Sequence, residues 1–260
     1  MKEDLTVALV QMALAWENPV QNRVAIQQHI EEISDAVDLI VLPEMFTSGF
    51  TMHGESIAET MNGESIQLLK NLAKKNNTAI TGSLVIKEHE QLYNRLVFIE
   101  PDGKISTYDK RHTFTLAGEH KVYTAGKEKV IIDYKGWKIC PLICYDLRFP
   151  VWARNTEDYD LLLYVANWPK PRINAWDALL KARAIENMSY CIGVNRVGLD
   201  GNNHEYPGHS ACYDVLGHRI DSIPENKEAI EVVTLEKSKI KTYRDKLNFL
   251  NDRDHFNFRE

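Results

Sequence analysis

The sequence predicts a layered α/β fold in which mixed β-sheets are covered by helices. Three observations support this prediction: apolar runs of strand length recur along the chain, amphipathic segments with helical spacing lie between some of them, and hairpin signals interrupt the alternation. An all-parallel doubly wound fold has no place for such hairpins. The sheets should therefore contain antiparallel as well as parallel strands.

The expected strands are short runs of apolar residues, several of which have no polar position in them. They are TVALVQM near Val7, DLIVLP near Ile40, AITGSLVI near Ile80, RLVFIE near Val97, WKICPLIC near Leu142, LLLYVA near Leu163 and YCIGVNRV near Val194. Because a strand with apolar residues at consecutive positions is covered on both faces, several of these strands should lie between other layers.

The expected helices lie between these runs. Asn18 can cap a first helix with Pro19 at its first position. The apolar positions that recur at roughly helical spacing in this helix are Val20, Val24, Ile26, Ile30 and Ile33. A second amphipathic helix is expected from about Glu64 to Lys75, and a third from about Ala175 to Met188. In the second helix the inward residues are Ile66, Leu69, Leu72 and Ala73.

Hairpin turns are expected at two places. Pro101-Asp102-Gly103 separates two strand-like runs, and Lys135-Gly136 separates VIIDY from WKICPLI. Gly and Asp favour tight turns because they tolerate the backbone angles that such turns require. No glycine-serine linker, low-complexity tract or repeat divides the chain, so residues 1–260 are expected to form a single domain.

Composition favours a small-molecule partner inside the cell. The net charge of -6 is spread over the chain without a basic block, which argues against nucleic acid as a partner. The N-terminal MKEDLTVALVQM lacks the features of a signal peptide, and no apolar stretch approaches the roughly 18 residues of a membrane span. A cytoplasmic location with no membrane partner is therefore expected. The four cysteines should be reduced thiols.

Cys144 is the first candidate for chemistry. It follows an apolar strand and precedes a polar segment, so it should lie where a strand gives way to a loop or to the start of a helix. Backbone N-H groups at such a turn lower the pKa of a thiol and can hold a developing oxyanion. The alternative is a buried core cysteine, which is a common role for this residue. Cys140, Cys191 and Cys212 are assigned that structural role.

Glu44 is the second candidate, because it follows a buried-type strand and Pro43 in LIVLPEMF. Ligand sites favour the carboxyl ends of strands in α/β sheets. A carboxylate in a dry pocket can take a proton from a thiol and return it to a leaving amine. The alternative is an exposed acid in a surface turn, and the position alone leaves both open.

Lys110 and Glu119 complete the set of candidates. Lys110 lies in the run YDKRH after an expected strand, and Glu119 lies in AGEH shortly afterwards. A buried ammonium beside two acids would stay charged and stabilise an oxyanion, and Glu119 could orient a substrate amide or the attacking water. The alternatives are a solvated basic patch and an ordinary loop acid. Spacing alone does not decide between these roles.

Three segments together carry a resemblance to a known family. LPEMF around Glu44, YDKRHTF around Lys110 and LICYDLRFP around Cys144 resemble, in order and spacing, the signature segments of the nitrilase superfamily of carbon-nitrogen hydrolases. The similarity extends from VALVQM through NWPKPRINAWDALLKARAIENMSYCIGVNRVG to YRDKLNFLNDRDHF. It therefore covers almost the whole chain.

The resemblance implies a fold and a set of roles. The fold is a four-layer α-β-β-α sandwich of mixed sheets flanked by helices, usually paired in a homodimer or a higher homo-oligomer, with no metal and no organic cofactor. By the same resemblance Glu44 is the general base, Lys110 stabilises the oxyanion and Cys144 is the nucleophile. Glu119 matches a second family glutamate, and the Tyr145 N-H would complete the oxyanion hole.

Within the superfamily, GEHKVYTAG, NWPKPR and the tail resemble the omega-amidase branch. That branch implies hydrolysis of the terminal amide of 2-oxoglutaramate or 2-oxosuccinamate. Residues near the motif segments are then the candidates for substrate binding: Phe46, Tyr145, Trp168 and Arg172. Arg172 or Arg111 would pair with a substrate carboxylate, unless each is an ordinary surface ion pair. For Arg148 the alternative is a brace for the loop after Cys144.

Other functions remain open at this stage. An N-carbamoyl amino-acid amidohydrolase or a nitrilase would use the same four residues on a different substrate. A non-catalytic interaction protein on this scaffold would normally lack one of them. A metal hydrolase is disfavoured because no HExxH motif or paired CxxC appears, and a Rossmann-type nucleotide binder is disfavoured because no glycine-rich loop follows the first strand.

Overall fold

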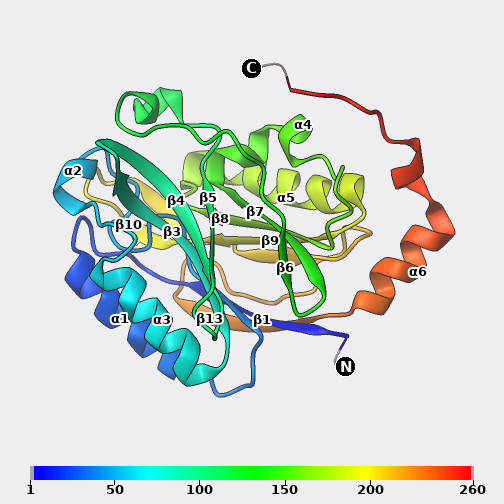
Figure 1. The fold of residues 1–260 in the computed structure, drawn as a ribbon, viewed down its shortest axis with the longest axis horizontal. Helices are drawn as coiled ribbons and strands as arrows, with labels where there is room; N and C mark the ends of the chain where they lie inside the picture. Colours follow the sequence, from blue (N-terminus) through cyan, green and yellow to red (C-terminus); the bar gives the residue numbers. More distant parts are fainter. Residues whose placement is uncertain (1–2, 259–260) are drawn as a thin grey trace.

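Two stacked β-sheets form the centre of the molecule in a computed structural model that describes residues 3–258 (Figure 1). The larger sheet has six strands in the order β13 (Ala229–Leu235), β1 (Leu5–Gln11), β2 (Leu39–Val41), β3 (Ala79–Glu88), β4 (Gln91–Ile99) and β5 (Ile105–Asp109). The smaller has five, in the order β12 (Ala211–Tyr213), β9 (Tyr190–Asn195), β8 (Leu161–Ala166), β7 (Trp137–Ile143) and β6 (Ile132–Tyr134). All the strands expected from apolar runs are present.

Both sheets are mixed, as the sequence predicts. In the larger sheet β1, β2 and β3 are parallel, while β13, β4 and β5 pair antiparallel with their neighbours. In the smaller sheet β7, β8 and β9 are parallel, and β6 and β12 are antiparallel edge strands. The turns at Pro101-Asp102-Gly103 and Lys135-Gly136 form the β4–β5 and β6–β7 hairpins as expected.

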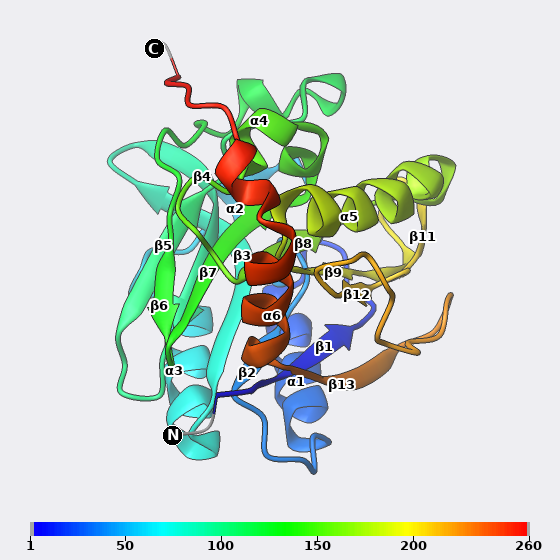
Figure 2. The ribbon, with the colours of Figure 1, turned by 90° about the vertical axis from the view of Figure 1, so that its right-hand side faces the viewer.

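Helices cover the outer face of each sheet and complete the α-β-β-α sandwich, which confirms the predicted fold class (Figure 1). The larger sheet is covered by α1 (Pro19–Glu31) and α3 (Glu64–Asn76), and the smaller by α4 (Pro150–Ala153) and α5 (Ile173–Asn187). Short α2 (Gly54–Ile57) lies near β3. Figure 2 shows α6 (Lys237–Leu247) along the side of the molecule, with the chain continuing from it toward α4.

Helix α1 begins as expected but buries a different face. The Asn18 side chain caps it by accepting a hydrogen bond from the Gln21 N-H at 3.1 Å. Ile26 and Ile30 are buried, whereas Val20 and Val24 are exposed. The reason is angular: Asn22, Ile26 and Ile30 lie four residues apart on one face, and at about 100° per residue Val20 and Val24 project from the opposite side. Helix α3, in contrast, buries all four of its predicted inward residues.

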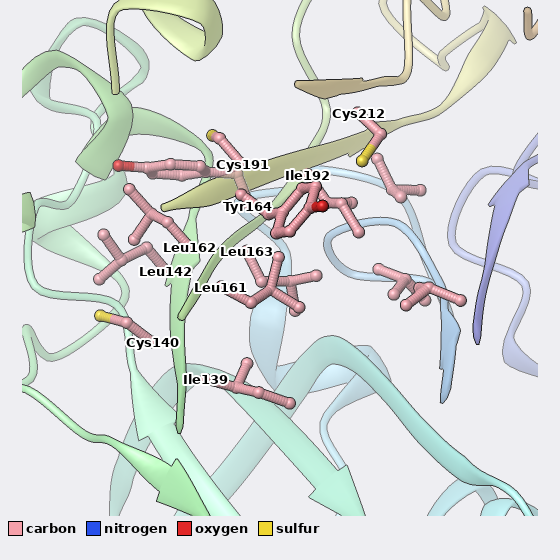
Figure 3. Close-up of a cluster of buried hydrophobic side chains, with 14 of the residues drawn as sticks. Ile139, Cys140, Leu142, Leu161, Leu162, Leu163, Tyr164, Cys191, Ile192 and Cys212 are labelled. Atoms are coloured by element: carbon pink, nitrogen blue, oxygen red, sulfur yellow. The ribbon is translucent and has the colours of Figure 1, made fainter. Parts of the chain in front are cut away.

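The core has one layer between the sheets and another between the larger sheet and its helices. The first contains Val7, Leu9 and Val41 of the larger sheet together with Ile139 and Leu163 of the smaller. Figure 3 shows side chains of β7, β8, β9 and β12 in this core, with Cys140 from β7, Cys191 from β9 and Cys212 from β12 among them. These three cysteines are buried, in agreement with the structural role assigned to them.

Several elements have no clear signal in the sequence. The β3–β4 hairpin turns at His89 and Glu90, which both adopt positive φ without the glycine or asparagine that usually marks such a turn. The hairpin of β10 (Val197–Leu199) and β11 (Glu205–Pro207) has strands of only three residues. None of the helices in residues 3–258 is long and apolar enough to cross a bilayer.

Candidate active site

The two sheets bring four chain segments together at one edge of the sandwich. Glu44 follows β2, Lys110 follows β5, Cys144 follows β7 and Asn167 follows β8. Strands β2, β7 and β8 belong to parallel ladders, and parallel strands end at the same edge of a sheet. The buried parallel core of each sheet thus delivers polar side chains to a common site, as expected for ligand sites in α/β folds.

Lys110 lies at the centre of this site and is only 1% exposed. Its Nζ lies 2.8 Å from Glu44 Oε1 and 3.0 Å from both carboxylate oxygens of Glu119. Burial lowers the pKa of the ammonium, but the charges of Glu119 and Glu44 outweigh it, and the pKa of Lys110 is raised above its ordinary value. The solvated basic patch is therefore excluded, and Lys110 is a buried, charged group.

Glu44 is fully buried, and both of its carboxylate oxygens accept hydrogen bonds. Besides Lys110, its Oε1 accepts a hydrogen bond from Asn94 Nδ2 at 2.8 Å. Its Oε2 accepts one from the Asn167 N-H at 2.8 Å, and the Asn167 side chain donates to the Glu44 carbonyl at 2.6 Å. These donors fix the carboxylate in one orientation, so the surface-turn alternative for Glu44 is wrong.

Glu119 lies at the start of a 3₁₀ turn, Glu119–Lys121, and is also fully buried. Its Oε2 accepts a hydrogen bond from the Phe114 N-H at 2.5 Å, and its Oε1 accepts one from Asn94 Nδ2 at 3.3 Å. Burial raises the pKa of Glu119, and the neighbouring charge of Lys110 opposes that rise. Lys110 therefore bridges two buried carboxylates, Glu44 and Glu119.

Cys144 adopts a left-handed backbone conformation, with φ of 43°, at the point where β7 gives way to the 3₁₀ turn Cys144–Arg148. Its Sγ lies 3.9 Å from the Asn167 carbonyl. The expected lowering of the thiol pKa is wrong. Burial and the charge of Glu44 raise the pKa of Cys144 well above its ordinary value, and Lys110 only partly opposes them. The resting thiol is therefore neutral at physiological pH.

A cavity of about 610 Å³ opens onto this cluster. Its wall includes Lys110 and Cys144 together with three of the four predicted substrate-binding residues, Tyr145, Trp168 and Arg172. Aromatic and apolar side chains make up much of the remaining wall, among them Trp16, Phe50, Met52, Phe114 and Leu116. A mostly apolar cavity with a few convergent polar groups is typical of a small-molecule site.

Two arginines on this wall have no carboxylate partner. Arg148 lies over the Trp168 ring and Arg172 over the Phe114 ring, at 5.0 Å and 5.1 Å from the ring centroids. Within residues 3–258 neither makes a salt bridge, unlike the acid-paired arginines 23, 95, 183, 219, 244 and 253. The ordinary surface ion pair is therefore excluded for Arg172, and Arg148 also lines the cavity. Both guanidinium groups remain available to an anion.

Two predicted contacts with the cavity are wrong. Phe46 is fully buried in the apolar cluster under α1 and α3, where its ring fills the space left by Gly82. A hydrophobic residue just after a strand can turn inward as readily as toward a site. Arg111 lies over the Trp152 ring and donates to the Gly126 carbonyl, so it is occupied away from the cavity.

The structure also reveals site residues that sequence reasoning missed. Asn94 contacts both glutamates from the middle of β4, where a polar residue inside an apolar strand was the available signal. Asn167 follows LLLYVA directly, so the strand-end argument that found Glu44 applies to it as well. Among the described residues, no three His, Cys, Asp or Glu side chains group together as metal ligands.

The fold and the site together define a class of protein. Two mixed sheets between helical layers, with a cysteine, a buried lysine and a buried glutamate at strand ends, are the features of the nitrilase superfamily. The chain belongs to the carbon-nitrogen hydrolase family, whose model matches residues 6–245. The resemblance inferred from the three sequence segments is thereby confirmed.

Known relatives match over nearly their full length. The chain is 43% identical to the omega-amidase YafV of Yersinia enterocolitica over 97% of this chain and 98% of that protein. It is 35% identical to the 2-oxoglutaramate amidase of Bacillus subtilis, over 82% and 83%. The crystal structure of XC1258 from Xanthomonas campestris, a CN-hydrolase superfamily protein, is similar with a TM-score of 0.96 and 40% identity, over 98% and 99%.

Proposed function

We propose that this chain is an omega-amidase. It hydrolyses the terminal amide of a small omega-amide such as 2-oxoglutaramate or 2-oxosuccinamate to the dicarboxylic acid and ammonia. The observation that carries the proposal is one cavity that holds a cysteine, a buried lysine paired with two glutamates, and two arginines that form no salt bridge within residues 3–258. The first two suit attack on an amide, and the arginines suit a substrate with a free carboxylate. The similarity to omega-amidase YafV and to a 2-oxoglutaramate amidase supports this substrate class.

The first half-reaction forms a thioester. Because the Cys144 thiol is neutral at rest, Glu44 takes its proton as the sulfur attacks the amide carbon. Negative charge then develops on the substrate oxygen, where Lys110 stabilises it. The Tyr145 N-H assists, since it belongs to the first turn of a 3₁₀ helix, where backbone N-H groups have no partner within the helix.

The thioester forms as ammonia leaves at the end of the first half-reaction, and the second half-reaction then releases the acid. Glu44 returns its proton to the nitrogen, the carbon-nitrogen bond breaks and ammonia leaves. Water then attacks the thioester carbon while Glu44 accepts the water proton, and the carbon-sulfur bond breaks to restore the thiol. Glu119, which is fixed by Lys110 and the Phe114 N-H, orients the amide in the first step and the water in the second.

Substrate selection occurs on the cavity wall. Arg172 and Arg148 bind the carboxylate at the far end of the substrate, and Tyr145 and Trp168 border its carbon chain. A guanidinium pairs bidentately with a carboxylate, which fixes orientation as well as charge. The cavity wall therefore holds the amide carbon over Cys144.

Ammonia release from 2-oxoglutaramate tests this function. The substrate is run beside glutamine, an N-carbamoyl amino acid and a simple nitrile, with Cys144→Ser as the control. Rapid release from the keto-amide that is lost in Cys144→Ser is the expected result. Turnover of only the carbamoyl compound or the nitrile would favour an N-carbamoyl amino-acid amidohydrolase or a nitrilase, and no turnover of any substrate would favour a non-catalytic interaction protein.

We further propose that residues 1–260 fold as one domain, that the enzyme acts in the cytoplasm, and that it assembles as a homodimer or a higher homo-oligomer. Support for one domain comes from the core between the sheets, which takes residues from the first strand to α6. Light scattering on the purified chain tests the assembly, and a mass near twice 29.9 kDa is the expected result for the dimer.

A further inference from the structure

Asp146 is a buried carboxylate that the proposed reaction does not use. It lies two residues after Cys144 and has no exposed surface. Its Oδ2 accepts hydrogen bonds from Tyr108 Oη at 2.8 Å and from the Ile143 N-H at 3.0 Å. Its Oδ1 accepts from the His112 N-H at 2.9 Å and lies 2.8 Å from His112 Nδ1. A buried carboxylate with this many donors is held in one position.

The partners of Asp146 come from the two chain segments that carry the reacting groups. Tyr108 and His112 stand two residues before and two residues after Lys110. Ile143 is the residue before Cys144. These segments belong to different sheets, because β5 ends the larger sheet and β7 lies inside the smaller. Asp146 is therefore a direct link between the backbone that carries the ammonium and the backbone that carries the thiol.

A second ring of contacts holds the link in place. Tyr108 Oη accepts hydrogen bonds from Trp152 Nε1 at 3.0 Å and from the Arg111 N-H at 3.2 Å. The His112 ring stacks on Phe149, with ring centroids 3.6 Å apart and planes 3° from parallel. Tyr108 and His112 are thus each fixed from the other side, so the carboxylate cannot shift without moving several packed groups.

The Cys144 turn needs such a restraint. A residue with a side chain seldom adopts positive φ, and the hydrogen bond from the Ile143 N-H to Asp146 closes the turn on either side of Cys144. If this bond were lost, the thiol and the Tyr145 N-H would move together relative to Lys110. Groups that stabilise an oxyanion work only when they are positioned in advance.

We propose that Asp146 is a positioning residue that sets the place of Lys110 relative to Cys144 and the Tyr145 N-H. It acts through Tyr108, His112 and the Ile143 N-H and does not touch the substrate. The effect on amide turnover rests on the proposed function, whereas the effect on the reactivity of the thiol does not. Asp146 thereby joins the two halves of the oxyanion site across the interface between the sheets.

The test compares Asp146→Asn with the matched control Asp160→Asn. Asp160 is also buried, and its Oδ2 also accepts a backbone N-H, from Lys138 at 3.0 Å, but it lies at the opposite end of β8 from Asn167. In Asp146→Asn the kcat for the keto-amide is expected to fall on the order of 10- to 100-fold with KM within about threefold, since small misplacements of reacting groups cost this much. Asp160→Asn should keep kcat within about twofold.

Three further measurements separate positioning from stability. Folded fractions of both variants are measured by urea denaturation, and equal kcat per folded molecule would overturn the proposal. Alkylation of Cys144 by iodoacetamide at neutral pH should slow in Asp146→Asn but not in Asp160→Asn, even if the wild type hydrolyses no omega-amide. In a Lys110→Ala background Asp146→Asn should add little, and full additivity of the two losses would contradict action through Lys110.

A milder variant covers the case in which Asp146→Asn does not fold. Tyr108→Phe removes one donor to Asp146 and keeps the ring in the core. Its kcat is expected to fall by a factor of about three to ten at unchanged KM, from the loss of one hydrogen bond to a charged group. A folded Tyr108→Phe variant with wild-type kcat and wild-type alkylation rate would overturn the proposal.

Discussion

The floor and the wall of the cavity differ in whether their charged side chains are paired. On the floor, Lys110, Glu44 and Glu119 pair with one another at 2.8 to 3.0 Å and are shut off from solvent. On the wall, Arg148 and Arg172 lie over aromatic rings and form no salt bridge with any residue that the structure describes. The charges of the floor are paired within the protein, whereas the arginines of the wall gain a carboxylate partner only when an anion binds.

This difference separates two tasks. Charges that are fixed and paired in a dry site need no rearrangement when an oxyanion forms, which favours lowering the barrier of the chemical step. Guanidinium groups without a salt bridge break no ion pair when a carboxylate binds, which favours binding the substrate in the right direction. Substitutions on the floor should therefore act on kcat, and substitutions on the wall should act on KM.

The largest effect is expected from Lys110→Met. The variant leaves Glu44 and Glu119 buried together without their ammonium, and breaking such a buried pair typically costs about 3–5 kcal/mol of stability. It also removes an oxyanion donor, so kcat should fall about 10²- to 10³-fold. Stopped-time ammonia assays and urea denaturation measure the two quantities.

The matched control for Lys110 is Lys104→Met, which removes an exposed lysine paired with Glu100 at 2.7 Å. Exposed pairs contribute little, so both activity and stability should stay near wild type. Equal losses in the free energy of unfolding for Lys110→Met and Lys104→Met would mean that the buried pairs of Lys110 stabilise the protein no more than an exposed ion pair does.

A smaller and more selective effect is expected from Arg172→Gln and from Arg148→Gln. Each loses a charge-assisted hydrogen bond worth about 1.5–3 kcal/mol, so kcat/KM for the keto-amide should fall about 10- to 100-fold, mainly through KM. A neutral primary amide without a carboxylate should be hydrolysed at nearly the wild-type rate.

Arg111→Gln is the control for the wall, because this arginine binds Trp152 and Gly126 outside the cavity. Its kcat/KM should change little for either substrate. Equal losses on the charged and the neutral amide in Arg172→Gln would mean that the arginine supports the cavity structurally and does not recognise a carboxylate.

The floor could be predicted from the sequence much better than the wall. Glu44 and Cys144 each follow an apolar strand, and strand ends converge by the geometry of parallel sheets, so local signals locate them. The wall is assembled from loops that meet only in the folded chain. Hence Phe46 was expected on the wall but lies in the core, and Arg148 lines the cavity although it was not among the predicted substrate-binding residues.

The fold shows the same division. The sequence predicted the strands with consecutive apolar residues and helix α3 with its regular apolar face. In both, a short stretch of sequence is enough to indicate which residues are buried. Helix α1 was found, yet its inward face was not, since its buried side includes Asn22, which binds Ala15 and Thr47 backbone atoms. The short strands β10 and β11 and helix α6 carry too few apolar residues to signal their place.

The smallest effect is expected in the pH dependence of Cys144 alkylation, where the sequence-based prediction of a lowered thiol pKa was reversed. In the wild type, Glu44 assists the neutral thiol at neutral pH, and a second rise in rate follows at alkaline pH as the thiolate forms. Burial and then the charge of Glu44 raise the pKa of Cys144. In Glu44→Gln the alkylation of Cys144 at neutral pH should therefore be slower than in the wild type. The increase in its alkylation rate at alkaline pH should begin at a lower pH.

Glu119→Gln provides the comparison for this last effect. Glu119 is bound to Lys110 on the same floor, but the charges that act on the thiol pKa are those of Glu44 and Lys110. The alkaline rise should therefore stay near its wild-type pH in Glu119→Gln while it moves down in Glu44→Gln. If the alkylation rate rose at the same alkaline pH in the wild type and in Glu44→Gln, Glu44 would not face the sulfur. Glu44 would then not be the general base for Cys144.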